Sequence, residues 1–331
     1  MKTLGIIGLG RMGSGVARRC ARAGVTVYGY DPHVVAVEGV TVVSSIKELL
    51  QHVEVILLLV PAGDAVDEAL AEIIVARATS EGAAEKQPPI IIDGGNSWYK
   101  DSLRRHALLT QDQLSFLDMG ISGGVHGEKD GFCVMVGGNT QAFAEVEPLL
   151  RIIAAPNGVV HTGTAGSGHY TKMVHNGIEY GIMQAYAEGA HLLKEGAYPN
   201  LDLPAITQAW HHGSVIRSWL LQLLHESVSD TELLKKTSGV IHENGTGRWT
   251  VQEAKDRKVP VATIEAALAK RAWSRESGGD FASLIVALLR NKFGGHALEK
   301  KEAMDCEEHD RQRHPLEGQL DAQEHDKEIN L

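Results

Sequence analysis

A glycine-rich turn near the start of the chain constrains the fold more than any other feature. Gly8-Leu-Gly-Arg-Met-Gly13 follows a strand-like run at 3–7 and precedes a helical pattern at 13–23, with a second strand-like run at 26–30. Between a strand and a helix, such glycines let the backbone approach a pyrophosphate, whose charge the helix N-terminus favours. We therefore predict a strand–helix–strand unit that binds a dinucleotide through Gly8, Leu9, Gly10, Arg11, Met12 and Gly13.

Asp31 directly follows the second of these strands, 23 residues after Gly8. A carboxylate at that place accepts hydrogen bonds from the hydroxyls of an adenine ribose and repels a 2′-phosphate. We therefore expect NAD to be preferred, with NADP as the other option. The alternative is an ordinary turn aspartate in front of Pro32. Val60 and Pro61 end a further strand, where loops border the cofactor, and are additional candidates for contact with it.

Strand-like and helix-like segments alternate through the first half of the chain. Continuous apolar strands separated by helices are typical of a mostly parallel, doubly wound sheet that is buried on both faces. We therefore predict an α/β Rossmann-type domain at 1–165. The predicted strands are 3–7, 26–30, 41–43, 55–60, 90–93, 115–119, 132–136 and 159–161.

From about residue 166 onward, helical patterns replace the strand signal. They predict an all-α domain at 166–300. The remaining segment, 301–331, is charged and poor in apolar residues, so we expect it to be flexible. The candidate helices are 168–195, 203–212, 214–228, 231–237, 251–256, 262–273 and 281–293.

Composition argues against several classes of function. The 331 residues carry a formal net charge of −10, which disfavours a general nucleic-acid or membrane-surface role. Cys20, Cys133 and Cys306 lie far apart and show no zinc-site spacing, as expected in a reducing compartment. The chain has no apolar run long enough to span a membrane, and its short apolar start merges with the glycine motif. We expect a cytoplasmic protein.

The segment Lys172-Met-Val-His-Asn-Gly-Ile-Glu179 carries the strongest chemical signal. Lys172, His175, Asn176 and Glu179 are spaced i, i+3, i+4 and i+7, so a helix places them on one stripe. Such a stripe offers a base, an acid and polar anchors to a single pocket. A solvated polar face is the alternative, but the position directly after a nucleotide-binding domain favours a site.

Three further motifs are expected in loops that face a ligand. Asp93-Gly-Gly-Asn-Ser-Trp-Tyr99 and Gly120-Ile-Ser-Gly-Gly124 each follow a strand, and Gly245-Thr-Gly-Arg-Trp-Thr250 interrupts the helical region. Glycine, serine and asparagine in such loops present hydrogen-bond donors to a hydroxylated, anionic ligand. The alternative is structural, because a single Gly-Gly pair is usually only a turn.

Together the motifs resemble those of the β-hydroxyacid dehydrogenase superfamily. The glycine-rich start, Gly120-x-Ser-Gly-Gly124 and Gly168-x-x-x-Lys172 carry this resemblance, and 93–99, 172–180 and 245–250 narrow it to decarboxylating 6-phosphogluconate dehydrogenases. The similarity spans roughly residues 3–297. It implies oxidative decarboxylation of 6-phospho-D-gluconate to D-ribulose 5-phosphate and CO2 with reduction of NAD(P), a step of the pentose phosphate pathway and of gluconate utilisation.

The same resemblance implies the roles of two residues. Lys172 is the base that takes the proton of the C3 hydroxyl, and Glu179 is the acid that protonates the enediol left after CO2 departs. A base must be neutral and an acid protonated, so Lys172 needs a lowered pKa and Glu179 a raised one. No metal is needed, because protonated Lys172 polarises the C3 carbonyl.

The resemblance also implies which residues bind substrate. Arg290-Asn-Lys-Phe-Gly-Gly-His296 is similar to a family segment whose arginine and histidine reach the substrate from a neighbouring subunit. We therefore expect a homo-dimer or homo-tetramer, and leave open whether these two residues act within their own chain. An exposed helix end is the structural alternative. The implied substrate-binding residues are Asn96 (also beside the cofactor), Ser122, Gly123, Gly124, His175 and Asn176 for the carboxylate and hydroxyls, Tyr180 and Arg271 for the phosphate, and Arg290 and His296.

Two departures from the family pattern matter. Only 18 residues separate Arg271 from Arg290, where long members carry another helical block, so the chain resembles the short form, which is often NAD-linked. Asn244 stands where the long form has a phosphate-binding lysine, which leaves the phosphate ligands open.

Two other functions compete with this reading. A non-decarboxylating 3-hydroxyacid dehydrogenase, such as one for 3-hydroxyisobutyrate, would share the glycine motif and Lys172. It would not need Glu179, Tyr180 and Arg271. A catalytically inactive NAD-binding regulator is the second alternative, and the intact pair of Lys172 and Glu179 argues against it.

Overall fold

The computed structural model describes residues 3–79 and 87–301. Its first half contains an eight-stranded sheet with the order β3-β2-β1-β4-β5-β6-β7-β8. All neighbouring strands are parallel except β6 and β7, which confirms the predicted α/β fold with a mostly parallel sheet. The strands are β1 (Leu4–Ile7), β2 (Val27–Tyr30), β3 (Thr41–Val42), β4 (Val55–Leu58), β5 (Ile90–Asp93), β6 (Phe116–Ser122), β7 (Phe132–Gly138) and β8 (Ala154–Gly163).

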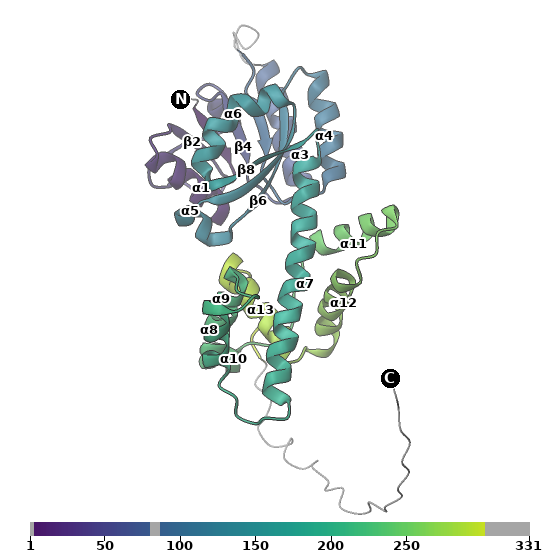
Figure 1. Cartoon of the computed structure of the whole chain (residues 1–331). Coiled ribbons are helices and arrows are strands. Elements are labelled where there is room, and N and C mark those ends of the chain that lie inside the picture. Colours follow the sequence, from purple (N-terminus) through teal and green to yellow (C-terminus); the bar gives the residue numbers. More distant parts are fainter. Residues whose placement is uncertain (1–2, 80–86, 302–331) are drawn as a thin grey trace, which may run out of the picture.

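Helices cover both faces of this sheet (Figure 1). They are α1 (Arg11–Arg22), α2 (Ile46–Leu49), α3 (Asp64–Ala78), α4 (Tyr99–Gln111), η1 (Gly124–His126), α5 (Gly127–Asp130) and α6 (Thr140–Ile153). Leu4 and Ile6 pack with α1 and α6 on one face, whereas Ile7 packs with α2, α3 and α4 on the other. Successive strand residues point to opposite faces, so a strand buried on both faces must be apolar throughout.

The second half of the described chain is helical. It comprises α7 (Ser167–Glu195), α8 (Leu203–Gly213), α9 (Trp219–Ser229), α10 (Thr231–Lys236), α11 (Thr246–Arg257), α12 (Ala262–Ser277) and α13 (Phe281–Gly294). Figure 1 shows α7 leaving the sheet and running as a rod through this half, with α11 and α12 on one side and α8, α9 and α13 on the other. Met183, Leu224 and Ile285 belong to a separate buried core there. No helix of the described chain is both long and apolar enough to cross a membrane.

One predicted loop is a helix instead. The segment 245–250 was expected to interrupt the helical region, but α11 already begins at Thr246. Gly247 lies in the first turn, and a Cβ there would come within 2.4 Å of the Tyr180 ring. This glycine therefore permits close packing of two helices, a requirement that a sequence does not distinguish from turn formation.

Other observed helix and strand boundaries differ from the predicted ones. β6 continues through Gly120 to Ser122, so the first part of the predicted 120–124 loop is strand. β8 is longer than predicted, and α9 begins at Trp219 because the Ser218 side chain accepts a hydrogen bond from the Leu221 N–H. Residues 302–331, almost all of the predicted tail, lie outside the described residues.

Candidate active site

The glycine-rich turn connects β1 to α1 at the edge where the sheet order reverses between β1 and β4. Gly8 has φ +94°, and a Cβ on Gly13 would lie 1.8 Å from the Gly8 carbonyl oxygen, so both positions require glycine. Within the described part of the chain, a Cβ on Gly10 would meet nothing within 4 Å, and no side chain caps the start of α1. Open backbone donors at a helix N-terminus fit the pyrophosphate of a dinucleotide.

Asp31 lies beside this turn, directly after β2. One carboxylate oxygen accepts a hydrogen bond of 2.8 Å from the Leu9 N–H. The other accepts bonds of 2.8 and 3.2 Å from the N–H groups of His33 and Val34. Asp31 therefore does shape its own turn, as the structural alternative held, and the same bonds fix its carboxylate next to the glycine-rich turn.

A cavity of about 750 Å³ opens between the sheet and the helical half. It brings together most of the predicted site residues from both halves of the chain. Gly8, Leu9, Gly13, Asp31 and Arg271 do not line it, although Leu9 borders an adjoining cavity with Gly10, Arg11 and Met12. The predicted residues that do line it are Gly10, Arg11, Met12, Val60, Pro61, Asn96, Ser122, Gly123, Gly124, Lys172, His175, Asn176, Glu179, Tyr180, Arg290 and His296.

The predicted stripe on α7 faces this cavity. Burial lowers the pKa of Lys172, against the attraction of the Glu179 carboxylate. Burial raises the pKa of Glu179, against the attraction of Lys172, Arg271 and Arg290. The pKa of His175 is also lowered, by burial and by the neighbouring Lys172. The base and acid candidates are therefore shifted in the two directions that their chemistry needs.

Strand β6 holds this stripe in place. A Cβ on Gly120 would lie 2.2 Å from the Lys172 Cβ, so the strand and α7 are in direct contact at this point. Two residues further on, the Ser122 hydroxyl and His175 Nε2 are hydrogen-bonded at 3.3 Å. The 120–124 motif thus positions Lys172 and His175 as well as lining the cavity.

Contacts with α11 complete the stripe. The Asn176 amide donates long hydrogen bonds of 3.5 and 3.4 Å to the side chains of Asn96 and Thr246. The Tyr180 hydroxyl donates to the Asn244 side chain at 3.5 Å. Asn244 and Thr246 both line the cavity, so the residue at the expected lysine position does belong to the site.

The predicted phosphate ligands occupy two places. Arg271 is 1% exposed and lies beneath Tyr180, and its two terminal nitrogens have no hydrogen-bond partner among the described residues. Burial lowers its pKa to about 10. Arg290 and His296 line the cavity of their own chain, and burial together with the Arg290 charge lowers the pKa of His296 to about 4.

The side chain of Arg11 joins the two halves. Its guanidinium donates to the carbonyl oxygens of Gly294 and Gly295, at 3.3 and 2.5 Å. These glycines lie between Arg290 and His296, so the first residue of α1 steadies the end of α13.

Sequence reasoning missed the apolar part of the cavity. Ile178, Ile182, Trp219, Leu220 and Phe293 line it. Ile178 and Ile182 are 52% and 40% exposed, and their i+3 and i+7 spacing from His175 could have revealed them. Trp219 gives no comparable signal, because it comes from a different helix.

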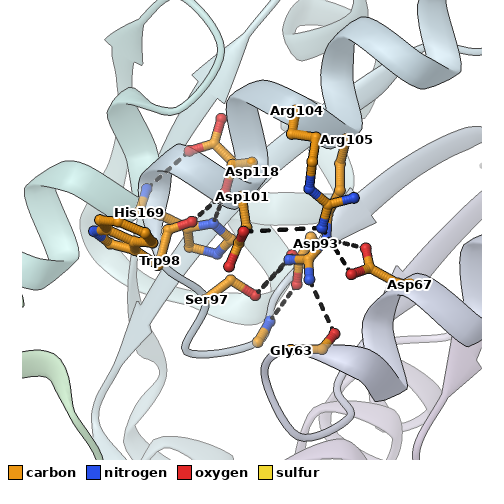
Figure 2. A network of polar contacts seen from close by, with 12 residues as sticks. Gly63, Asp67, Asp93, Ser97, Trp98, Asp101, Arg104, Arg105, Asp118 and His169 are labelled. Atoms are coloured by element: carbon orange, nitrogen blue, oxygen red, sulfur yellow. Dashed lines mark hydrogen bonds and ion pairs between the residues drawn. The ribbon is translucent and has the colours of Figure 1, made fainter.

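A polar network around α4 was missed as well (Figure 2). Arg105 has no exposed side-chain surface and forms an ion pair of 3.1 Å with the equally buried Asp93. On the other side of α4, the Ser102 hydroxyl is hydrogen-bonded at 2.7 Å to His169, one turn before Lys172. Asp118 accepts bonds from the N–H groups at the start of α7, where a carboxylate is favoured. The sequence did offer a signal for this network, because Asp93 and Asp118 stand inside otherwise apolar strands. A buried acid requires a polar or charged partner.

Comparison with known proteins gives consistent results. Residues 3–168 match the family model described as the NAD binding domain of 6-phosphogluconate dehydrogenase, and 168–303 match that of its C-terminal domain. The NAD(+)-dependent, decarboxylating 6-phosphogluconate dehydrogenase of Haloferax volcanii is 40% identical over 90% of this chain and 99% of its own length. A Bacillus subtilis relative is 39% identical over the same shares.

A solved structure agrees with these matches. Plasmodium falciparum 6-phosphogluconate dehydrogenase, determined alone, with NADP+ and with 6-phosphogluconate, has a TM-score of 0.69 and 30% identity. The match covers 82% of this chain and 62% of that longer one. From the two family models and these relatives, the chain belongs to the 6-phosphogluconate dehydrogenase family.

Proposed function

We propose that this protein oxidatively decarboxylates 6-phospho-D-gluconate to D-ribulose 5-phosphate and CO2 and reduces NAD. The observation that carries the proposal is that Lys172 and Glu179 line one cavity together with residues of the glycine-rich turn. Their pKa values are shifted in opposite directions. The names of the Haloferax volcanii and Plasmodium falciparum relatives support the same reaction.

The chemistry divides between the two residues. Neutral Lys172 accepts the proton of the C3 hydroxyl, and the bound nicotinamide supplies the acceptor for the hydride that leaves C3. The ammonium group of Lys172 then donates a hydrogen bond to the C3 carbonyl oxygen while the carboxylate leaves as CO2. Protonated Glu179 finally gives its proton to the carbon that lost CO2. The lowered pKa of Lys172 and the raised pKa of Glu179 support this division.

Different polar residues in and behind the cavity suit the two ends of the substrate. Asn96, Ser122, His175 and Asn176, with the backbone of Gly123 and Gly124, are assigned to the carboxylate and hydroxyls. Arg271, Arg290, His296 and Tyr180 are assigned to the phosphate. The two terminal nitrogens of Arg271 without partners support this assignment, because a buried guanidinium requires acceptors.

Asp31 supports NAD over NADP. Its carboxylate is fixed beside the glycine-rich turn, where it would bond ribose hydroxyls and repel a 2′-phosphate. The Haloferax volcanii relative is named as NAD(+)-dependent, whereas the Plasmodium falciparum enzyme was solved with NADP+. We further propose a cytoplasmic homo-dimer or homo-tetramer, with cofactor binding in 1–165 and substrate binding in 166–300.

A 3-hydroxyacid dehydrogenase is the less favoured function. A small unphosphorylated acid would bring no phosphate to the guanidinium groups of Arg271 and Arg290. It would also have no need for the acid Glu179, because no enediol forms without loss of CO2.

A steady-state assay with 6-phosphogluconate tests the proposal. NADH absorbance and CO2 release should rise in equal amounts, and Lys172→Ala should lower kcat by about 100-fold or more, as expected for loss of a general base. NAD reduction with 3-hydroxyisobutyrate and without CO2 would instead show that the substrate assignment is wrong.

A further inference from the structure

The buried side chain of Arg105 connects three elements on the cofactor side of the cavity. Its Nη1 donates to Asp93 and Ser97, at 3.1 and 3.2 Å, in the loop after β5. Its Nη2 donates to the Gly63 carbonyl at 3.0 Å, in the loop after β4, and its Nε donates to Asp67 at 2.8 Å, in α3. Figure 2 shows these bonds converging on one guanidinium.

Both loops held by Arg105 line the cavity. Val60 and Pro61 come from the loop after β4, and Asn96 comes from the loop after β5. A smaller cavity of about 180 Å³ lies where these loops meet, lined by Val60, Gly95, Asn96 and Met12 among others. The loops touch each other, since a Cβ on Gly95 would lie 3.2 Å from the Val60 carbonyl oxygen.

The loop after β5 is built around the same ion pair. Asp93 Oδ1 accepts a bond of 3.0 Å from the Gly95 N–H, and Oδ2 accepts one of 2.9 Å from the Ser97 hydroxyl. Arg105 neutralises this carboxylate, which has no exposed surface. The turn that contains Asn96 therefore depends on the positive charge of Arg105, which α4 carries.

We propose that Arg105 is a positioning residue that sets the space for the nicotinamide ring by holding the loops after β4 and β5 at a fixed separation. This inference rests on the proposed function, because it assumes a nicotinamide cofactor whose adenosine end lies at Asp31. Arg105 itself is not among the described residues that line either cavity. Its planar fork reaches Gly63, Asp67 and Asp93 at once, which the single ammonium group of a lysine does not.

The test compares Arg105→Lys with Arg104→Lys. Arg104 is the adjacent residue, bonds the same Asp67 at 2.7 Å and has a 54% exposed side chain. Its ion pairs among the described residues are with Asp67 and Asp101, in α3 and α4 rather than in either loop. For each variant, kcat is measured at saturating NAD and 6-phosphogluconate. The fluorescence emission of bound NADH reports the surroundings of the reduced nicotinamide, and titration with ADP-ribose reports the adenosine half alone.

Arg105→Lys should lower kcat at least about tenfold and shift the emission of bound NADH toward that of free NADH. The Kd for ADP-ribose should stay within about threefold of wild type, because the glycine-rich turn and Asp31 are untouched. Arg104→Lys should resemble wild type in all three measurements. A purely structural role would change ADP-ribose and NADH binding in parallel.

Three results would overturn the inference. The first is a folded Arg105→Lys with wild-type kcat and wild-type NADH emission, and the second is an equal loss of kcat in Arg104→Lys. The third is a loss of ADP-ribose binding in Arg105→Lys that parallels the loss of NADH binding. If Arg105→Lys does not fold, Ser97→Ala replaces it. That variant removes a hydroxyl bonded to both Arg105 and Asp93 without removing a charge, and normal kcat with normal NADH emission in it would also reject the inference.

The proposed function fails in a different way. Wild-type protein that binds NADH and ADP-ribose but does not turn over 6-phosphogluconate would reject the substrate assignment. The fluorescence and ADP-ribose arms would then still decide the role of Arg105.

Discussion

The Cζ atom of Arg271 lies 3.2 Å from the ring centroid of Tyr180. Tyr180 lines the cavity, whereas Arg271 is buried behind it with two nitrogens that lack partners among the described residues. The ring and the guanidinium form a stacked pair, which offsets part of the cost of burying the charge. These donors are already desolvated, so they would bind strongly an anion that reached them from beside Tyr180.

Arg271→Lys should therefore raise the KM for 6-phosphogluconate by about 10- to 100-fold, the range expected for losing charged hydrogen bonds. Slow turnover of unphosphorylated gluconate should change little. Arg275→Lys is the control, because Arg275 lies one turn further along α12 and bonds the Ile241 carbonyl instead. Equal effects on both substrates would show that Arg271 does not recognise the phosphate.

The pKa shifts of Lys172 and Glu179 predict a bell-shaped pH dependence of kcat/KM. Rising pH removes a proton from Lys172, which makes it a base, and it also removes the proton that Glu179 must donate, so kcat/KM falls at both extremes of pH. The two groups interact, so the apparent pKa values belong to the pair. The lowered pKa of Lys172 extends its base form to lower pH, and the raised pKa of Glu179 extends its acid form to higher pH.

Glu179→Gln should remove the alkaline limb and lower kcat by about 100-fold or more. Initial rates of NADH formation between about pH 5 and about pH 10 give the profile. Glu188→Gln makes the same change on the same helix outside the cavity, where Glu188 bonds Gln184, and it should keep the wild-type profile. An alkaline limb that persists in Glu179→Gln would assign that limb to another group.

Two glycines should respond to alanine in opposite ways. Gly120→Ala places a methyl group 2.2 Å from the Lys172 Cβ, so it should lower the free energy of unfolding by about 1–3 kcal/mol and also lower kcat. Gly189→Ala, in α7, meets nothing within 4 Å and should raise the free energy of unfolding by about 0.5–1 kcal/mol. Urea unfolding measures both changes. Wild-type stability and turnover in Gly120→Ala would contradict the tight contact.

Asp31→Asn tests the cofactor preference. The amide keeps an oxygen that accepts from the Leu9 N–H but loses the charge that repels a 2′-phosphate. The ratio of kcat/KM for NAD to that for NADP should fall by about tenfold or more, as expected for a charged hydrogen bond to ribose. An unchanged ratio would mean that Asp31 serves only the turn.

Several features of this protein follow from local sequence. The glycine pattern between two apolar runs predicted the β1–α1–β2 unit, because chain geometry at Gly8 and Gly13 permits little else. The spacing of Lys172, His175, Asn176 and Glu179 predicted one stripe on α7, since a helix of 3.6 residues per turn aligns them. These are periodic or steric rules that act over a few neighbouring residues.

Other features depend on partners far away in the chain. The antiparallel pairing of β6 and β7, the start of α11 at Thr246 and the stacking of Arg271 on Tyr180 each require two segments to meet. The same holds for Arg105, whose acceptors lie in α3 and in two separate loops. Local sequence determined most of the helices and strands and which reactive groups they carry. Only the tertiary structure decided which groups are buried, and burial is the main cause of the pKa shifts that suit Lys172 and Glu179 to their chemistry.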